Sequence, residues 1–372
     1  MSTSSRNLLY ICLILAAAVF AASTFLAIHN DSAGTQGAAV SLGLTSTGNT
    51  EVAPPDPNTH ILFVGDMMFD RAVRKTINSN GYEFVFGDAK TLFDKNRTGG
   101  PDLVVGNLEG SITTFPSRTL RPSGSTGDAP LDFTFATPTA AALKSFGVDV
   151  VSLANNHSAN RGEAGLAQTR KYLTSAGVEF FGDPGNLSDK SIVKCIKDLC
   201  IGLIGYHEFA YKNDEVVLND IKALKERTDL IIVMPHWGIE YQKTPTKLQR
   251  SLAHNWIDAG ADIVIGAHPH IVESIEEYNG HKIFYSLGNF IFDQYFSFDT
   301  THGIAVDISI PPTYSSTTPN NFSFTLIPIE NKNTVMSFPD ASTSTYILND
   351  LANSSAKYVS TSTKASILTG KI

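Results

Sequence analysis

One stretch predicts both the class of the fold and the position of a site: Ile263-Val264-Ile265-Gly266-Ala267-His268-Pro269-His270. Its β-branched apolar residues indicate a buried strand, and two histidines follow that strand at alternate positions. Open α/β sheets bind ligands beyond the carboxyl ends of their strands. Imidazoles gathered at such a place suit a metal ion of the zinc, manganese or iron type. Because His-x-His at a strand end is often purely structural, the pair needs support from the rest of the chain.

Four other segments share this design, in which polar side chains follow an apolar strand. They are Phe63 to Met68, Val104 to Glu109, Val151 to His157, and Val233 to Trp237. Neighbouring strands lie about 4.8 Å apart, so one sheet would bring these ends together. The combined set offers Asp, Glu, Asn and His side chains to a single pocket. Mixed oxygen and nitrogen ligands of this kind fit one or two divalent ions that promote hydrolysis.

Each cluster also has a simpler explanation. Asp66 after a glycine is typical of a turn or a helix N-cap, and Asn155-Asn156 is typical of an Asx turn. A single histidine such as His157 or His236 is usually a hydrogen-bonded core residue, and Glu109 fits a solvated carboxylate. These explanations are independent of one another. Since all five clusters fall at strand exits, a shared site accounts for them better than five coincidences.

The composition is that of a globular protein. The chain has 372 residues, of which 42% are hydrophobic and 17% charged, with a formal net charge of −8. This length and composition supply material for a large core. No basic cluster suggests a nucleic-acid groove, so we exclude that class of function. The acidic balance also argues against tight electrostatic binding to anionic lipid or polymer.

The N-terminus departs from this composition. Residues 8–28 carry no charge and are about long enough to cross a bilayer core, which takes roughly 20 residues. That length favours an uncleaved anchor in the cytoplasmic membrane, and Arg6 on the short side favours a topology with the body outside the cytoplasm. Small residues at the end of the run keep a cleaved signal peptide, and hence secretion, open as the alternative. We therefore assign residues 1–29 to an anchor or signal segment.

Further boundaries follow from composition. Residues 30–58 are rich in Ser, Thr, Gly, Ala and Pro and predict a flexible linker. Residues 59–330 read as one domain in which β-α units alternate with hairpins, including one at Asn279-Gly280. That mixture predicts an α/β fold with mixed sheets covered by helices. Residues 331–372 are Ser/Thr-rich and predict a weakly ordered tail, with at most a helix around residues 346–352.

Two cysteines flank a short turn. Cys195 and Cys200 end two apolar strands, and Lys197-Asp198 reads as a two-residue turn between them. In that hairpin the two residues face each other at a separation that suits a disulfide. The oxidising side of a membrane would allow the bond to form. The alternative is a pair of reduced, buried cysteines.

Six phrases, in order, resemble a known family: GDMMFDR, GNLEGSIT, SLANNHSANRGEAG, PHWGIEY, GADIVIGAHPHI and YSLGNFIFDQ. They look like the bacterial poly-γ-glutamate capsule-synthesis protein family (CapA type), over about residues 60–310. That family is similar in turn to the calcineurin-like metallophosphoesterases. The resemblance implies a four-layer α/β/β/α sandwich with two mixed sheets face to face and helices outside.

The resemblance also implies roles for single residues. Asp66 matches the first metal-binding Asp of the phosphoesterase pattern, and Glu109 stands loosely where that pattern has a bridging Asp. Asn156 and His157 match its Asn-His pair, in which Asn binds metal and His acts as an acid. His236 matches a lone later ligand. The closing Gly-x-His-x-His corresponds to His268 and His270.

Three positions depart from the pattern. Met68 stands where the phosphoesterases carry a His two residues after their first Asp. The loss of this His weakens one of the two metal positions. The sequence is therefore as compatible with one bound ion as with two. Gly-Asp-x-x-Asp is replaced by Gly106-Asn107-Leu108-Glu109. Asn160 stands where family members often carry Asp, so a carboxylate that would orient a neighbour is lost.

The resemblance predicts a part in the synthesis, export or processing of an anionic surface polymer such as poly-γ-glutamate. The expected cofactor is a divalent metal (Mn, Zn or Fe), and the expected substrate is the polymer or a phosphoester. Arginine grips carboxylate or phosphate bidentately. Candidate substrate contacts are Arg71, Asn107, Arg161 and Asn289. The alternatives are a non-catalytic partner of membrane synthase subunits and a secreted phosphatase unrelated to capsule.

Overall fold

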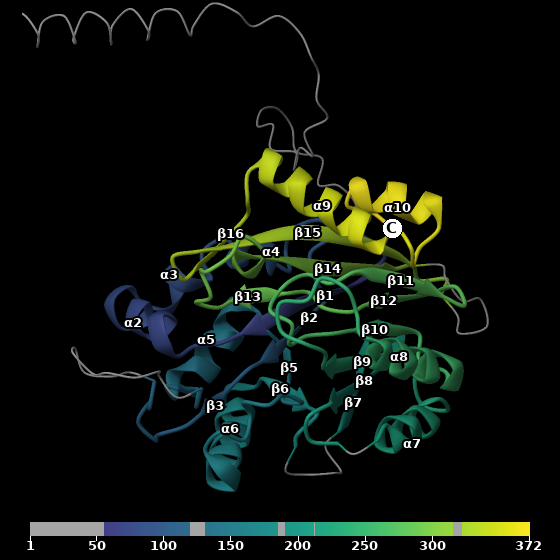
Figure 1. Cartoon of the computed structure of the whole chain (residues 1–372). Coiled ribbons are helices and arrows are strands. Elements are labelled where there is room, and N and C mark those ends of the chain that lie inside the picture. Colours follow the sequence, from purple (N-terminus) through teal and green to yellow (C-terminus); the bar gives the residue numbers. More distant parts are fainter. Residues whose placement is uncertain (1–55, 120–130, 185–189, 212, 315–321) are drawn as a thin grey trace, which may run out of the picture. The chain divides into compact units, whose positions relative to one another are not determined.

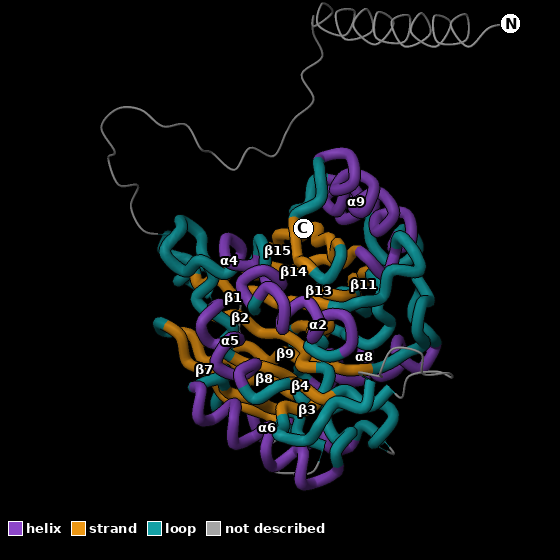
Figure 2. Tube along the Cα trace, turned by 90° about the vertical axis from the view of Figure 1, so that its left-hand side faces the viewer, coloured by secondary structure: helices purple, strands orange, loops and turns teal. Residues whose placement is uncertain are grey.

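Two mixed β-sheets face each other in the computed structural model, which describes residues 56–119, 131–184, 190–211, 213–314 and 322–372. Figures 1 and 2 show the strands enclosed between helices. The larger sheet has the order β16 (Val335–Ser337), β15 (Ser323–Lys332), β14 (His302–Ile310), β1 (Thr59–Met67), β2 (Leu103–Leu108), β5 (Val150–Ser152) and β6 (Glu179–Phe181), and β13 (Asn289–Ile291) also pairs with β1. The smaller sheet has the order β11 (Ile275–Tyr278), β12 (His281–Phe284), β10 (Ile263–Ile265), β9 (Leu230–His236), β8 (Leu199–His207) and β7 (Ser191–Ile196).

Helices cover the outer face of each sheet. The larger sheet is covered by α2 (Arg71–Asn80), α3 (Tyr82–Phe86), α4 (Ala89–Leu92), α5 (Pro138–Phe146) and α6 (Gly162–Ala176). The smaller sheet is covered by α7 (Glu215–Leu224) and α8 (Lys247–Ala259). A short parallel pair, β3 (Ser111–Ile112) and β4 (Thr134–Phe135), and the 3-10 turn Asp299–Thr301 complete the domain. The predicted four-layer arrangement with two mixed sheets is confirmed.

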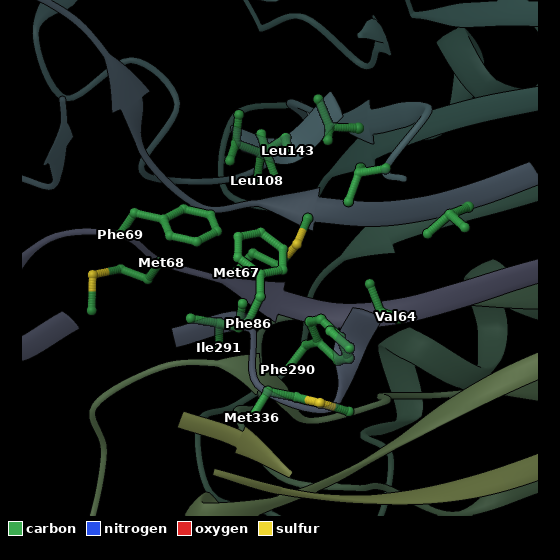
Figure 3. Close-up of a cluster of buried hydrophobic side chains, with 14 of the residues drawn as sticks. Val64, Met67, Met68, Phe69, Phe86, Leu108, Leu143, Phe290, Ile291 and Met336 are labelled. Atoms are coloured by element: carbon green, nitrogen blue, oxygen red, sulfur yellow. The ribbon is translucent and has the colours of Figure 1, made fainter. Parts of the chain in front are cut away.

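The alternation of side chains along the strands builds these layers. In β1, Ile61 and Phe63 pack between the two sheets, whereas Leu62 and Val64 pack under the helices of the larger sheet. Successive side chains of a strand point to opposite faces, so an all-apolar strand joins two cores at once. Figure 3 shows the core on the helix side, where Val64 and Met67 lie among buried Phe and Leu side chains.

Local sequence signals explain the position of a helix start, a turn and a hairpin. Thr246 caps α8 by accepting from Gln249 N, and the Gln249 side chain accepts from Thr246 N, which completes a capping box. Asn279 and Gly280 both have positive φ, as a type I′ turn between β11 and β12 requires. A disulfide joins Cys195 and Cys200, which face each other across the β7–β8 hairpin.

The C-terminal segment differs from the expected weakly ordered tail. It contains β16, α9 (Ala341–Ser355) and α10 (Thr361–Leu368). The two helices (yellow in Figure 1) bring Ile347, Leu351 and Ile367 into the core between the sheets. The helix expected around residues 346–352 lies within α9, but the prediction of weak order is wrong because a Ser/Thr-rich composition hides a few apolar residues at helical spacing. Those few are enough, since they cover apolar surface that the sheets leave open at their edge.

Residues 8–28, the predicted anchor, and most of the predicted linker lie outside the described residues. Among the residues that the structure does describe, no helix is both long enough and apolar enough to cross a membrane.

Candidate metal centre

The predicted site residues come together at the carboxyl ends of strands from both sheets. Asp66 and Asn107 are paired neighbours on β1 and β2. Asn156 and His157 follow β5, His236 ends β9, and His268 and His270 follow β10. Parallel neighbours end at a common edge, so each of these strands delivers its polar residue to the same place. Most of these side chains are buried, and Asn156 is half-buried.

A close approach of two chain segments places Asp66. The pairing of β1 with β2 shifts register between Val64 and Asp66. At this shift Gly65 lies so close to Gly288 that a Cβ on Gly65 would meet the Gly288 carbonyl oxygen at 1.9 Å. Asp66 N then donates to the same oxygen at 3.0 Å. Glycine is therefore required at position 65 if Asp66 is to reach the site.

Two side chains lie close to His236 Nε2. This atom lies 2.8 Å from Asn156 Oδ1 and 3.1 Å from His268 Nδ1. The backbone N–H of His268 donates to Asp66 Oδ2 at 3.2 Å, which links this group to the larger sheet. His268 and His270 have φ values of 101° and 59°. Non-glycine residues rarely adopt positive φ, and such conformations are found mainly where a site requires them.

The carboxylate of Glu109 lies among these residues without a hydrogen bond. Neither of its carboxylate oxygens has a hydrogen-bond partner among the described residues, although the side chain is fully buried. Its Oε1 lies 3.6 Å from His270 Nε2 and 3.7 Å from His157 Nε2. These separations exceed a hydrogen bond. They resemble the spacing of two atoms that ligate one tetrahedral ion at about 2.1 Å, which lie about 3.4 Å apart.

The donor set fits a divalent metal ion. Two groups of ligand atoms, each within 4.8 Å of one another, come from Asp66, Glu109 and His236 and from Glu240, His268 and His270. A buried carboxylate without a hydrogen bond is costly, and a bound cation would supply a stabilising interaction. Carboxylate, amide oxygen and imidazole together suit Mn, Zn or Fe. The geometry thus supports a divalent metal at this edge of the sheets.

Protonation states agree with this interpretation. Burial lowers the pKa of His268 to about 4, and burial lowers the pKa of His236 well below its ordinary value. Both imidazoles are therefore neutral near pH 7 and can offer a lone pair to a metal. His270 differs: burial lowers its pKa, but the carboxylates of Glu109 and Asp66 outweigh that effect and raise the pKa to about 9. Positive charge is favoured at the place where a cation would bind.

His157 is held by Asn160. The Asn160 Oδ1 accepts from Phe133 N at 2.7 Å and lies 2.9 Å from His157 Nδ1. Because that oxygen accepts from a backbone N–H, His157 Nδ1 carries the proton and its Nε2 is left facing Glu109. Burial lowers the pKa of His157 to about 4. The amide at position 160 thus orients His157, as a carboxylate there would.

Two asparagines that we expected to contact substrate are occupied by the site itself. Asn107 Nδ2 donates to Asp66 Oδ1 at 2.7 Å and lies 3.3 Å from His236 Nδ1. Asn289 Oδ1 lies 3.0 Å from His270 Nδ1. Both side chains are buried. They are positioning residues, because groups that hold the far nitrogen of a histidine fix the direction of its other nitrogen.

The two arginines differ in their positions. Arg71 Nε donates to Asp293 Oδ1 at 2.9 Å, and the guanidinium lies 5.1 Å from the centre of the Phe133 ring. Burial raises the pKa of Glu109 well above its ordinary value, and the positive charge of Arg71 opposes only a small part of that shift. Arg161 instead donates to Asp132 and to the Pro116 carbonyl. The structure gives it no contact with the cluster.

Sequence reasoning missed two residues of this region. His207 ends β8 in register with His236, is buried, and has no hydrogen-bond partner among the described residues. The signal was present, since Tyr206-His207 extends an apolar strand in the same way as the other clusters. Glu240 follows β9 in a loop, and no periodic pattern points to it.

The curated relatives come from capsule biosynthesis. The chain is 32% identical over 249 residues to "PGA biosynthesis protein CapA" of Bacillus subtilis, covering 62% of this chain and 63% of that protein. It is 32% identical over 251 residues to "Capsule biosynthesis protein CapA" of Bacillus anthracis, covering 62% and 59%. The match therefore spans less than two thirds of either relative. A "Probable polyglutamine synthesis accessory protein" of Mycobacterium tuberculosis is 25% identical over 240 residues, which cover 57% of this chain and 60% of that protein.

Solved structures align over most of the chain at low identity. A hypothetical protein from Thermus thermophilus aligns with 15% identity and a TM-score of 0.43, covering 73% of this chain and 99% of that one. The NAD nucleotidase of Haemophilus influenzae aligns with 13% identity and a TM-score of 0.44, covering 80% and 62%.

The family described as "Bacterial capsule synthesis protein PGA_cap" matches residues 60–294, which is more than half of the chain. This range contains every residue of the candidate metal centre named above. The chain belongs to the PGA_cap family of bacterial capsule synthesis proteins.

Proposed function

We propose that this protein uses a divalent metal centre to hydrolyse or transfer a phosphoester or amide during the synthesis, export or processing of an anionic surface polymer such as poly-γ-glutamate. The observation that carries the proposal is the buried carboxylate of Glu109, which has no hydrogen-bond partner among the described residues and faces His157 and His270. The relatives' names supply the biological setting.

The proposed ligands of the ion or ions are Asp66, Glu109, Asn156, His236, His268 and His270. A divalent ion supplies Lewis-acid polarisation of a phosphoryl or carbonyl oxygen. His157 holds no proton on Nε2 near pH 7, so in the free protein it accepts a proton or a hydrogen bond there. A bound anion would raise its pKa and turn the same atom into a donor, which is the role of an acid toward a leaving group. Arg71 supplies positive charge for an anionic substrate.

We also propose that the body works outside the cytoplasm, held to the cytoplasmic membrane by residues 8–28 and close to membrane synthase subunits. The Cys195–Cys200 disulfide supports this location, because disulfides persist in oxidising compartments and are rare in the cytosol. The apolar N-terminal run supports the anchor by its length.

The metal centre is tested first. The full-length chain, purified in detergent, is analysed for bound Mn, Zn and Fe beside His236→Ala and His268→Ala. Both variants should lose metal while circular dichroism shows an unchanged fold. Unchanged metal content in both would remove the metal centre.

Catalysis is tested separately. The Mn²⁺-loaded protein is assayed on bis-p-nitrophenyl phosphate, p-nitrophenyl phosphate and poly-γ-glutamate, beside His157→Gln. Turnover that His157→Gln abolishes without loss of metal supports the enzyme. The absence of turnover on all three substrates would favour the second candidate, a non-catalytic partner of a synthase complex, for which the methionine at position 68 is the supporting observation.

A further inference from the structure

Met68 is turned away from the metal centre. Its side chain is fully buried, and its sulfur accepts a hydrogen bond from Asp70 N at 2.9 Å. It belongs to the apolar core on the helix side of the larger sheet, where Figure 3 shows it near Phe69. Met68 therefore gives the metal centre no ligand, although the phosphoesterase pattern has a histidine at this position.

A loop of the smaller sheet lies against His268 and His270. The loop follows β9, and Tyr241 N donates to the carbonyl oxygen of Pro269 at 2.9 Å. Pro269 stands between His268 and His270, so this bond fixes the loop against the two imidazoles. Tyr241 has a φ of 66°, which adds a third left-handed residue to those at His268 and His270. Such conformations cost energy and are kept where the surrounding structure requires them.

The fixed loop carries Glu240 to the two histidines. One oxygen of Glu240 and one nitrogen each of His268 and His270 lie within 4.8 Å of one another. Glu240 is exposed, whereas both histidines are buried, so its carboxylate closes the cluster on the solvent side. Two imidazoles and one carboxylate are a common ligand set for catalytic zinc and for iron.

We propose that Glu240 is a metal ligand that, together with His268 and His270, replaces the nitrogen ligand missing at Met68. This inference rests on the proposed metal centre. It implies that the chain holds two ions, because the position weakened by Met68 is rebuilt from another loop. A carboxylate in place of an imidazole also makes that position harder and more negative, which favours Mn²⁺ over softer ions.

The test compares Glu240→Gln with Glu226→Gln, a matched removal of an exposed carboxylate in the turn after α7. Metal content and Mn²⁺ titration calorimetry are measured on the full-length proteins. Wild type and Glu226→Gln should bind two Mn²⁺ per chain. Glu240→Gln should keep one ion and bind the second at least tenfold more weakly, with the same melting temperature in EDTA. Glu240→His, which restores a ligand, should recover the second ion.

The outcomes separate the two proposals. If Glu240→Gln binds as many ions as wild type with the same affinities, Glu240 is not a ligand and the metal centre stands without it. If wild type binds no ion, the proposed metal centre itself is wrong, and the inference fails with it. Loss of both ions in Glu240→Gln with an unchanged fold would still identify Glu240 as a ligand, but one shared by both positions.

Discussion

Glu109 Oε1 and His270 Nε2 lie 3.6 Å apart in the interior, close enough to share a cation and too far apart to share a proton in a hydrogen bond. Both side chains are held at this distance by others: Asn289 fixes the far nitrogen of His270, and the carbonyl oxygen of Met67 accepts from Glu109 N at 2.9 Å. The spacing of the two side chains therefore suits a cation bound between them.

Glu109→Gln should therefore abolish metal-induced stabilisation while the metal-free fold survives. Glutamine keeps the size of the side chain and removes the negative charge. An ion present at about 100 times its dissociation constant stabilises a protein by about 2.7 kcal/mol. Melting with and without Mn²⁺ measures this effect. Wild type and Glu226→Gln should melt higher with Mn²⁺ and Glu109→Gln should not; an equal rise in all three would contradict the role of Glu109.

His60 should make stability depend on pH. Its Nδ1 lies 2.9 Å from Asp307 Oδ2 and its Nε2 3.1 Å from Asp56 Oδ2. The hydrogen bond to Asp307 raises the pKa of His60, against the opposing effect of burial. A raised pKa means that the stabilisation is complete below the unfolded value of about 6.5 and is lost as the pH rises through the folded value.

We accordingly expect His60→Gln to destabilise the fold by on the order of 1 kcal/mol more at pH 5.5 than at pH 8.5. Urea unfolding of wild type and variant at the two pH values measures the difference. Asp307→Asn serves as the control, because it should remove most of the same pH dependence. Equal losses at both pH values would show that His60 contributes by packing alone.

The Cys195–Cys200 bond should contribute to stability without touching the metal centre. It closes a loop with a sequence separation of 5 at an edge hairpin. Cross-linking so short a loop restricts the unfolded chain by about 2 kcal/mol at most. Urea unfolding of the Cys195→Ser/Cys200→Ser variant should show a loss no larger than this, with metal content unchanged. Added dithiothreitol should lower the stability of wild type and leave the double variant unaffected.

The C-terminal helix α10 offers two adjacent apolar residues with opposite exposure. Ile367 is fully buried between the sheets, whereas Leu368 is 45% exposed. Ile367→Ala should cost about 2 to 4 kcal/mol, because it leaves a cavity in the core. Leu368→Ala should change stability by no more than about 0.5 kcal/mol. Similar losses in urea unfolding would mean that α10 does not pack as described.

The residues that sequence could predict are those at the ends of apolar strands. His236 and Asp66 each follow a buried run, and parallel strands deliver such ends to one edge whatever the loops do. His207 obeys the same rule, and it was missed because β8 runs two residues beyond the apolar stretch Leu199 to Gly205. The alternation of strands, helices and hairpins predicted mixed sheets covered by helices, whereas the four-layer arrangement was implied by the family resemblance.

The rest depends on tertiary contacts that leave no local signal. Glu240 reaches the histidines only because Tyr241 is bonded to Pro269, a contact between two loops. The role of Asn107 is equally hidden, because its partners Asp66 and His236 come from different sheets. In the C-terminal segment, Ile347 and Leu351 are four residues apart, but so weak a helical pattern gains meaning only from the core that it covers.

The position of strand β1 in the sequence affects the order in which the domain folds. This strand is among the earliest parts of the domain to be synthesised, yet its neighbours β13 and β14 come from the last third of the chain. Pairings between segments so distant in sequence form slowly, because a long loop must close before they gain any stabilisation. Asp66 therefore meets Asn289 only late, and we expect a growing chain to remain without a usable cation pocket until nearly all of it has been synthesised.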